Sequence, residues 1–144
     1  MHAEQISIFL ENKAGRLSEV TRIFEEGRIN IRALSLADTS DFGILRLIVN
    51  DNEKAKRLLK ENGFTVRSTE VVAVEVQDKP GGLHQILTAL STAGVNVEYM
   101  YAFTIKQGGN GVLAFRFNDP DAAVRALQSS HIRMMSFEEL LPQI

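Results

Sequence analysis

The sequence carries one pattern twice, and this repeat limits the possible folds more than any other feature. Residues 12–17, Asn-Lys-Ala-Gly-Arg-Leu, match residues 78–83, Asp-Lys-Pro-Gly-Gly-Leu, which lie 66 positions later. Farther along, Gly43 matches Gly111 at an offset of 68, so the second copy has gained two residues. A repeat of this kind indicates two copies of one structural unit.

Each copy shows the same succession of hydrophobic periodicities. Alternating β-branched residues predict the first strands, and apolar residues three or four positions apart predict helices. Polar and glycine-rich segments at 38–41 and 106–110 predict turns between strands. The first copy is thus predicted to hold strands at 5–10, 29–36, 44–49 and 64–68 and helices at 17–24 and 53–61, and the second copy strands at 72–76, 95–103, 112–117 and 132–136 and helices at 83–90 and 121–128.

This order of elements predicts the α+β class. It is that of the ferredoxin-like βαββαβ unit, an antiparallel four-stranded sheet with two helices on one face. We expect two such domains, at residues 1–70 and 71–144, because the two copies account for nearly the whole chain. The boundary near residues 69–71 has no Pro, Gly or Ser linker, so we expect the two domains to be rigidly adjacent. One small unit buries little apolar surface and leaves sheet edges open, so we expect the two to be packed as a tandem pair.

Composition excludes several classes of function. The 144 residues carry 16 Lys and Arg against 18 Asp and Glu, and this net charge of −2 does not favour a nucleic-acid partner, although RNA-recognition motifs share the order of elements. No apolar stretch approaches the roughly 20 residues that cross a bilayer, and no secretory signal is visible. With no cysteine and no histidines at metal-ligand spacing, we expect no metal or cofactor and a cytoplasmic location.

A glycine follows the first predicted strand in both copies, at Gly15 and Gly81, and Gly82 is added in the second. Glycine allows a sharp turn and the close approach of a ligand. The first turn of the following helix offers free N–H groups and the positive end of the helix dipole, which suit a carboxylate or a phosphate. Asn12 or Asp78 stands beside this turn and offers oxygen acceptors for an ammonium group.

Asn30 and Asn96, where the second strands begin, are expected across the sheet from these glycines. A site with donors for a carboxylate and acceptors for an ammonium group describes a free amino acid. The alternative is that each glycine only turns the chain and that each Asn or Asp caps a helix or strand end. The repeat does not decide between the two, because duplication preserves a structural turn equally well.

The chain resembles the tandem ACT-domain proteins, over residues 4–70 and 71–140. The resemblance lies in the order, spacing and repetition of short motifs. The residues that carry it are 11–17 with 29–31 in the first copy, 78–83 with 94–97 in the second, and 38–46, which resemble the family's hairpin into its third strand.

The resemblance implies a regulatory fold that binds an amino acid between two domains paired side by side and controls an attached or partner enzyme. It implies no catalysis and no cofactor. Carried onto this chain, the family's ligand-binding positions are the loop residues Asn12, Ala14, Gly15, Arg16, Leu17, Asp78, Pro80, Gly81, Gly82 and Leu83 and the second-strand residues Asn30, Ile31, Arg32, Asn96, Val97 and Glu98.

The two copies differ at these positions. Arg16 is large where the second copy has Gly82, and Arg32 is cationic where the second copy has Glu98. We therefore expect the second copy to be roomier and better able to take an ammonium group. Its loop is the expected ligand site, completed by residues of the first copy or of a second chain.

The leading hypothesis is an amino-acid-binding regulatory protein that works as a homodimer, as open sheet edges and the resemblance suggest. The alternative is a regulatory small subunit, or interaction module, of an enzyme of amino-acid metabolism, with ligand binding secondary. No nucleophile with a base and no pair of carboxylates is indicated by local spacing, so we expect no enzymatic activity.

Overall fold

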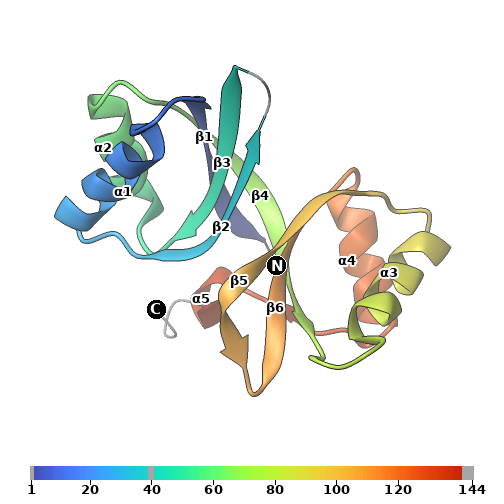
Figure 1. Ribbon diagram of the computed structural model, residues 1–144. Helices are drawn as coiled ribbons and strands as arrows, with labels where there is room; N and C mark the ends of the chain where they lie inside the picture. Colours follow the sequence, from blue (N-terminus) through green and yellow to red (C-terminus); the bar gives the residue numbers. More distant parts are fainter. Residues whose placement is uncertain (1, 39–40, 141–144) are drawn as a thin grey trace. The chain divides into compact units, whose positions relative to one another are not determined.

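The computed structural model describes residues 2–38 and 41–140 of the chain. Thr39 and Ser40 of the predicted turn at 38–41, and Leu141 of the C-terminal segment, lie outside the described residues. Glu4–Thr69 form one compact unit and the rest of the described chain the other, and we call them the first and second units. In chain order the elements are β1 (Ala3–Glu11), α1 (Arg16–Glu26), β2 (Ile31–Asp38), β3 (Phe42–Val49), α2 (Asn52–Glu61), β4 (Thr65–Val76), α3 (Gly82–Thr92), β5 (Val97–Gln107), β6 (Asn110–Phe117), α4 (Pro120–Ser129), β7 (Met134–Met135) and α5 (Phe137–Leu140) (Figure 1).

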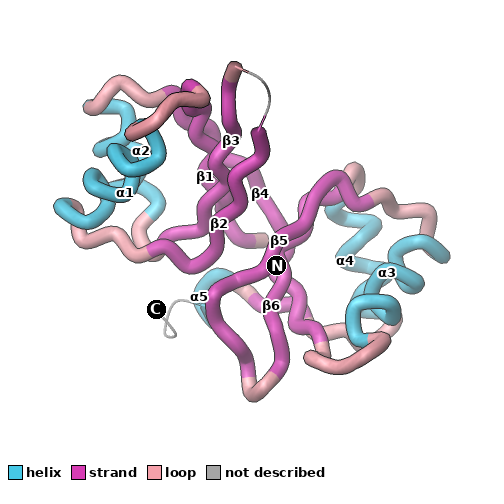
Figure 2. Tube along the Cα trace, in the orientation of Figure 1, coloured by secondary structure: helices cyan, strands magenta, loops and turns pink. Residues whose placement is uncertain are grey.

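The first unit has an antiparallel sheet with β3 between β1 and β2. Leu47 of β3 lies opposite Ile6 on one side and Leu34 on the other. Strand β1 also pairs with β4. Helices α1 and α2 lie together against one face of this sheet (Figure 2). The buried side chains between the helices and the sheet are Ile6, Ile8, Leu10, Val20, Ile23, Phe24, Ile29, Leu45, Leu47, Val49, Ala55, Leu59 and Phe64.

The second unit repeats this arrangement. Strand β6 lies between β4 and β5, and the two-residue β7 pairs with the other edge of β4. Helices α3 and α4 pack together in the same way (Figure 2). The core consists of Val72, Val74, Ile86, Leu90, Val95, Phe115, Phe117, Ala123, Leu127 and Met134.

Strand β4 corrects the expectation of a separate four-stranded sheet in each unit. The sequence predicts one strand at 64–68 and another at 72–76, but β4 runs without a break from Thr65 to Val76. It pairs with β1 and also with β6 and β7, so one strand serves both units. The physical reason is the sequence Thr69-Glu70-Val71, which has no Gly or Pro to end a strand and which contains two β-branched residues.

The four long helices begin in two ways. Asp51 caps α2, where its side chain accepts a hydrogen bond from the Lys54 N–H at 3.1 Å, and Asp119 caps α4 through the Ala122 N–H at 3.1 Å. Helices α1 and α3 instead begin after a glycine and have no side-chain cap. The N–H of the first residue of each helix donates to the backbone of the preceding turn, and no side chain of the capping residue accepts from the N–H groups that follow it.

None of the helices in the described ranges has the length and apolar character needed to cross a membrane.

The two aspartate caps give a direct test of the fold. Asp51→Ala and Asp119→Ala are each expected to lower the free energy of unfolding by about 1 kcal/mol, because a helix N–H loses its acceptor. Denaturant unfolding measures the change. Asp51→Asn and Asp119→Asn keep an acceptor oxygen, so each should lower the free energy of unfolding by only a fraction of that amount. An equal decrease for the Asn and Ala variants would contradict the capping role.

Candidate functional site

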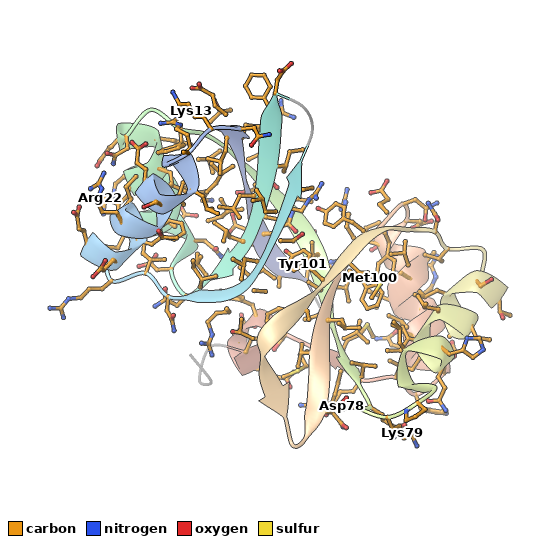
Figure 3. The ribbon with its side chains drawn as sticks, viewed as in Figure 1. Lys13, Arg22, Asp78, Lys79, Met100 and Tyr101 are labelled. Atoms are coloured by element: carbon orange, nitrogen blue, oxygen red, sulfur yellow. The ribbon has the colours of Figure 1, made fainter. Side chains whose placement is uncertain are left out.

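The turns from β1 into α1 and from β4 into α3 have the same backbone hydrogen bonds. The Lys13 N–H donates to the Glu11 carbonyl at 2.9 Å, and the Lys79 N–H donates to the Gln77 carbonyl at 2.9 Å. One step later, the N–H groups of residues 16 and 82 donate to the carbonyls of Lys13 and Lys79, at 3.4 and 3.0 Å. The side chains of Lys13, Asp78 and Lys79 project outward from these turns (Figure 3). Each turn is thus closed by its backbone.

Gly15 and Gly81 lie at the point where each turn becomes a helix. Their φ angles of 91° and 88° are in the left-handed region that glycine adopts without cost. A Cβ atom at either position would meet nothing within 4 Å, so open space adjoins both glycines. The backbone conformation, and not crowding, requires glycine at these two positions.

Gly82 is required for a different reason. A Cβ atom there would lie 2.1 Å from the Gln77 carbonyl oxygen, which is far inside van der Waals contact. The first residue of α3 therefore sits directly against the end of β4. The first unit has Arg16 at this position. The hydrogen bond from the Arg16 N–H to the Lys13 carbonyl, at 3.4 Å, is longer than the equivalent bond of 3.0 Å from Gly82 to Lys79.

A pocket adjoins each turn, and we call the two the first and second turn pockets. Both are formed by the end of a strand, the turn, the first turn of the helix and a glycine of the neighbouring strand. Their volumes are about 160 Å³ in the first unit and about 480 Å³ in the second. The first is lined by Leu10, Glu11, Asn12, Lys13, Leu17, Leu36 and Gly43, and the second by Val76, Gln77, Asp78, Lys79, Pro80, Leu83, Gly111 and Leu113.

The asparagines of the second strands lie at the other end of each sheet. Glu11, before the first turn, pairs with Phe42, whereas Ile31, after Asn30, pairs with Val49 at the far end of β3. At about 3.3 Å per residue these two ends are about 23 Å apart. The expectation that Asn30 faces the glycine turn of its own unit is therefore wrong.

The same correction holds in the second unit. Val76, before the second turn, pairs with Gly111, whereas Val97, after Asn96, pairs with Phe117 at the other end of β6. Sequence reasoning missed this although the predicted fold implies it, because two strands joined by a helical crossover are parallel and start at the same end of the sheet.

Asn30 and Asn96 have a structural partner there. The Asn30 N–H donates to the Asn50 side-chain oxygen at 2.9 Å, and the Asn50 N–H donates to the Asn30 carbonyl at 3.2 Å. The Asn96 N–H donates to the Asn118 side-chain oxygen at 2.9 Å, and the Asn118 N–H donates to the Asn96 carbonyl at 3.2 Å. These pairs fix the start of β2 and β5.

Three charged residues of the predicted site, Arg16, Arg32 and Glu98, do not line the turn pockets. Arg16 donates to Glu19 at 2.8 Å, and its guanidinium carbon lies 4.7 Å from the centre of the Phe64 ring. Glu98 forms an ion pair with Arg116 at 3.4 Å. Arg32 is buried, and this burial lowers its pKa. Five of the predicted site residues do line the turn pockets: Asn12 and Leu17 in the first unit, and Asp78, Pro80 and Leu83 in the second.

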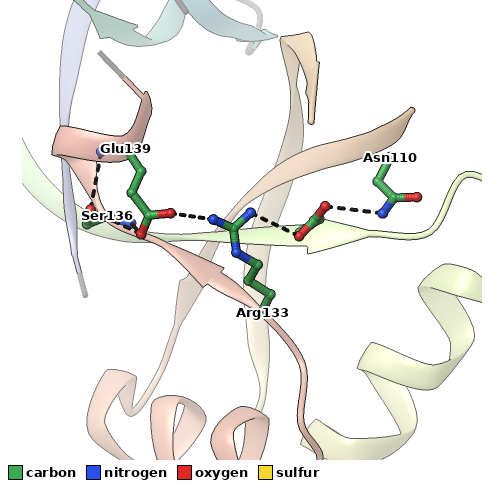
Figure 4. A network of polar contacts seen from close by, with 5 residues as sticks. Asn110, Arg133, Ser136 and Glu139 are labelled. Atoms are coloured by element: carbon green, nitrogen blue, oxygen red, sulfur yellow. Dashed lines mark hydrogen bonds and ion pairs between the residues drawn. The ribbon is translucent and has the colours of Figure 1, made fainter. Parts of the chain in front are cut away.

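Sequence reasoning also missed a polar network in the second unit (Figure 4). Glu75 accepts hydrogen bonds from Asn110 at 3.1 Å and from Arg133 at 3.2 Å, and Arg133 also binds Glu139 at 2.5 Å. Glu139 and Ser136 bond to each other's N–H groups at the start of α5. The spacing Ser-x-x-Glu at 136–139 is a capping-box signature and was a visible signal for that helix start.

The model of the family described as the ACT domain pair matches residues 1–142 of the chain. A protein of Bacteroides thetaiotaomicron of known crystal structure is 40% identical, with a TM-score of 0.91, over 98% of this chain and 96% of that one. The regulatory subunit of aspartate kinase from Thermus thermophilus, in its ligand-free form, is 15% identical over 89% of each chain, with a TM-score of 0.64. The latter similarity shows the shared fold alone. No curated protein shows a significant match.

The close approach at Gly82 is open to a stability test. Gly82→Ala is expected to lower the free energy of unfolding by about 1–3 kcal/mol, because the new methyl group must displace the Gln77 carbonyl. Leu83→Ala alters the next residue of α3, which is partly exposed, and should cost less than about 1 kcal/mol. Equal denaturation midpoints for the two variants would show that α3 has room to move.

Proposed function

Because the chain belongs to the ACT domain pair family, we propose that it is a non-catalytic regulatory protein that binds a free amino acid at its turn pockets. The observation that carries the proposal is the repeated combination of an uncapped helix start, a left-handed glycine with open space beside it, and an adjoining pocket. Free N–H groups at a helix start are donors for a carboxylate.

We propose the second turn pocket as the principal site. It is the larger of the two, and the Asp78 carboxylate stands where the first unit has the neutral Asn12. A carboxylate suits an ammonium group better than an amide does. Leu83 and Leu113 supply apolar contact for the side chain of the ligand.

The proposed mechanism is a shift of population between conformations. A ligand shifts the population toward the conformation that it binds more tightly. The size of the shift is set by the difference between its affinities for the two conformations. Such a protein acts on an enzyme of amino-acid metabolism through contact with it.

We further propose a homodimer, in which a second chain completes the ligand site. Leu34 and Leu36 on β2 are 46% and 53% exposed, which is unusual for two leucines on one strand. Covering them against a second chain would bury apolar surface.

A regulatory subunit or interaction module without a primary ligand is the second candidate. It is favoured by the distribution of exposed large apolar side chains. In the described part of the chain five of these lie in the first unit, and in the second unit only Leu83 does. The five are Phe9, Leu17, Leu34, Leu36 and Phe42. Such a surface fits a larger protein partner.

The homodimer is tested by light scattering. A mass of twice the 16.0 kDa chain is expected, and Leu34→Glu should return it to that of one chain by placing a charge in the interface. The exposed Thr21→Glu on α1 is the matched control and should leave the dimer intact. A single-chain mass for the unaltered protein would contradict the proposal.

A thermal-unfolding screen against the proteinogenic amino acids tests the ligand site. At ~100 times the dissociation constant a ligand adds about 2.7 kcal/mol to the state that it binds. For a chain of this size the midpoint should rise by roughly 5 to 15 °C for one amino acid or a few related ones.

Matched variants assign any such shift to a pocket. Leu83→Trp fills the second turn pocket and should abolish the rise of the unfolding midpoint. Leu17→Trp, at the equivalent position in the first unit, should leave that rise unchanged. A flat screen together with co-purification of a larger enzyme would favour the interaction module instead.

A further inference from the structure

The second unit holds another pocket, between the start of α3 and the segment from α4 to β7. We call it the inner pocket. Its volume is about 240 Å³, and it shares only Val76 and Gln77 with the second turn pocket. The residues that matter below are Glu75, Gly82, Gln85, Asn110, Ile132 and Arg133, which all line it.

The repeat shows what fills the equivalent place in the first unit. Arg16 stands at the position of Gly82, and its side chain turns inward onto Phe64, with the guanidinium carbon 4.7 Å from the ring centre. Glu19 binds the same guanidinium at 2.8 Å. The first unit therefore supplies its own guanidinium group, held between a carboxylate and an apolar side chain.

All three of these positions change in the second unit. Gly82 replaces Arg16, Gln85 replaces Glu19 at the same offset of 66, and Ile132 replaces Phe64 at the offset of 68. The equivalence at Ile132 is structural as well, since its N–H donates to Leu127 at 3.0 Å as the Phe64 N–H donates to Leu59 at 3.0 Å. The second unit has no guanidinium at this position, and the pocket there is lined by Gln85 and Ile132, the residues at the positions of Glu19 and Phe64.

The charged side chains at the inner pocket belong to a polar network. Glu75, whose side chain is 16% exposed, and Glu139 share the single guanidinium of Arg133 (Figure 4). Glu139 lies outside the pocket lining, in which Glu75 supplies one carboxylate and Arg133 one guanidinium group. Helix α3, on the other side of the pocket, contains no Asp, Glu, Lys or Arg.

We propose that the inner pocket binds a small molecule that carries a guanidinium group. The ligand takes the place that Arg16 occupies in the first unit: its planar cation packs on Ile132 and donates to the Gln85 side-chain oxygen and the Glu75 carboxylate. The volume lies below the ~300–1,000 Å³ typical of pockets for drug-sized ligands, so the ligand is of amino-acid size. The proposal does not depend on the turn pockets.

The test is calorimetric titration of the full chain with agmatine, L-arginine and L-citrulline. Agmatine has the guanidinium group but no carboxylate, so it separates this site from one that recognises an amino acid. Citrulline replaces the guanidinium by a neutral urea group of similar shape. Agmatine and arginine should bind, and citrulline should bind roughly tenfold more weakly or not at all.

Matched variants locate the site. Gln85→Glu restores the carboxylate of the first unit and should tighten agmatine binding roughly tenfold. Glu19→Gln, the mirror change in the first unit, should leave the affinity unchanged. Ser130→Trp, at an exposed position of the pocket lining, should abolish binding while α4 stays folded by circular dichroism, and Leu83→Trp in the turn pocket should have no effect.

The results separate this proposal from the function proposed above. If the affinity for agmatine changes as expected in the Gln85→Glu and Ser130→Trp variants, the inner pocket is supported, whether or not any amino acid stabilises the chain. The proposal is overturned if the unaltered protein does not bind agmatine, if citrulline binds equally well, or if Gln85→Glu leaves the affinity unchanged.

Discussion

The turn that leads from a strand into α1 or α3 is closed by backbone hydrogen bonds, and the pockets beside the two helix starts depend on it. Because the same backbone hydrogen bonds close both turns, the turns keep one conformation although their residues differ between the copies. The left-handed glycines fix where each helix starts, and the helix starts uncapped as a consequence. The turn pockets and the inner pocket all lie beside these helix starts.

Because the two units share one backbone arrangement, each unit can be compared with the other position by position. Equivalent hydrogen bonds recur at the turns, at the asparagine pairs and at the ends of α2 and α4. Differences in side chains can therefore be interpreted against a constant frame. The exchange of Arg16 for Gly82 is the clearest case, because it changes a filled space into a pocket without changing the path of the chain.

Much of the fold was predictable from local pattern. The helix predicted at 17–24 is α1 at Arg16–Glu26, and the glycine turns lie where the motif places them. Family membership is confirmed by the match over residues 1–142. The continuity of β4 was not predictable in the same way, since two adjacent strand signals are compatible with either one strand or two.

The site was harder to predict because its parts come from distant segments. Asn30 and the glycine turn are close in sequence but lie at opposite ends of β3, as the parallel direction of two strands joined by a helix requires. The inner pocket joins Glu75, Gln85 and Ile132, which no local spacing connects. Arg16 was expected at a ligand, but an aromatic ring and a carboxylate within its own unit hold it instead.

The presence of Arg16 and Gly82 on one chain has a consequence for symmetry. If two identical single-unit chains formed this pair, positions 16 and 82 would be one residue, and both spaces would be filled or both empty. Covalent duplication removes that restriction. One gene can then encode a copy in which an arginine packs on Phe64 beside a copy in which a glycine at the same position lines a pocket.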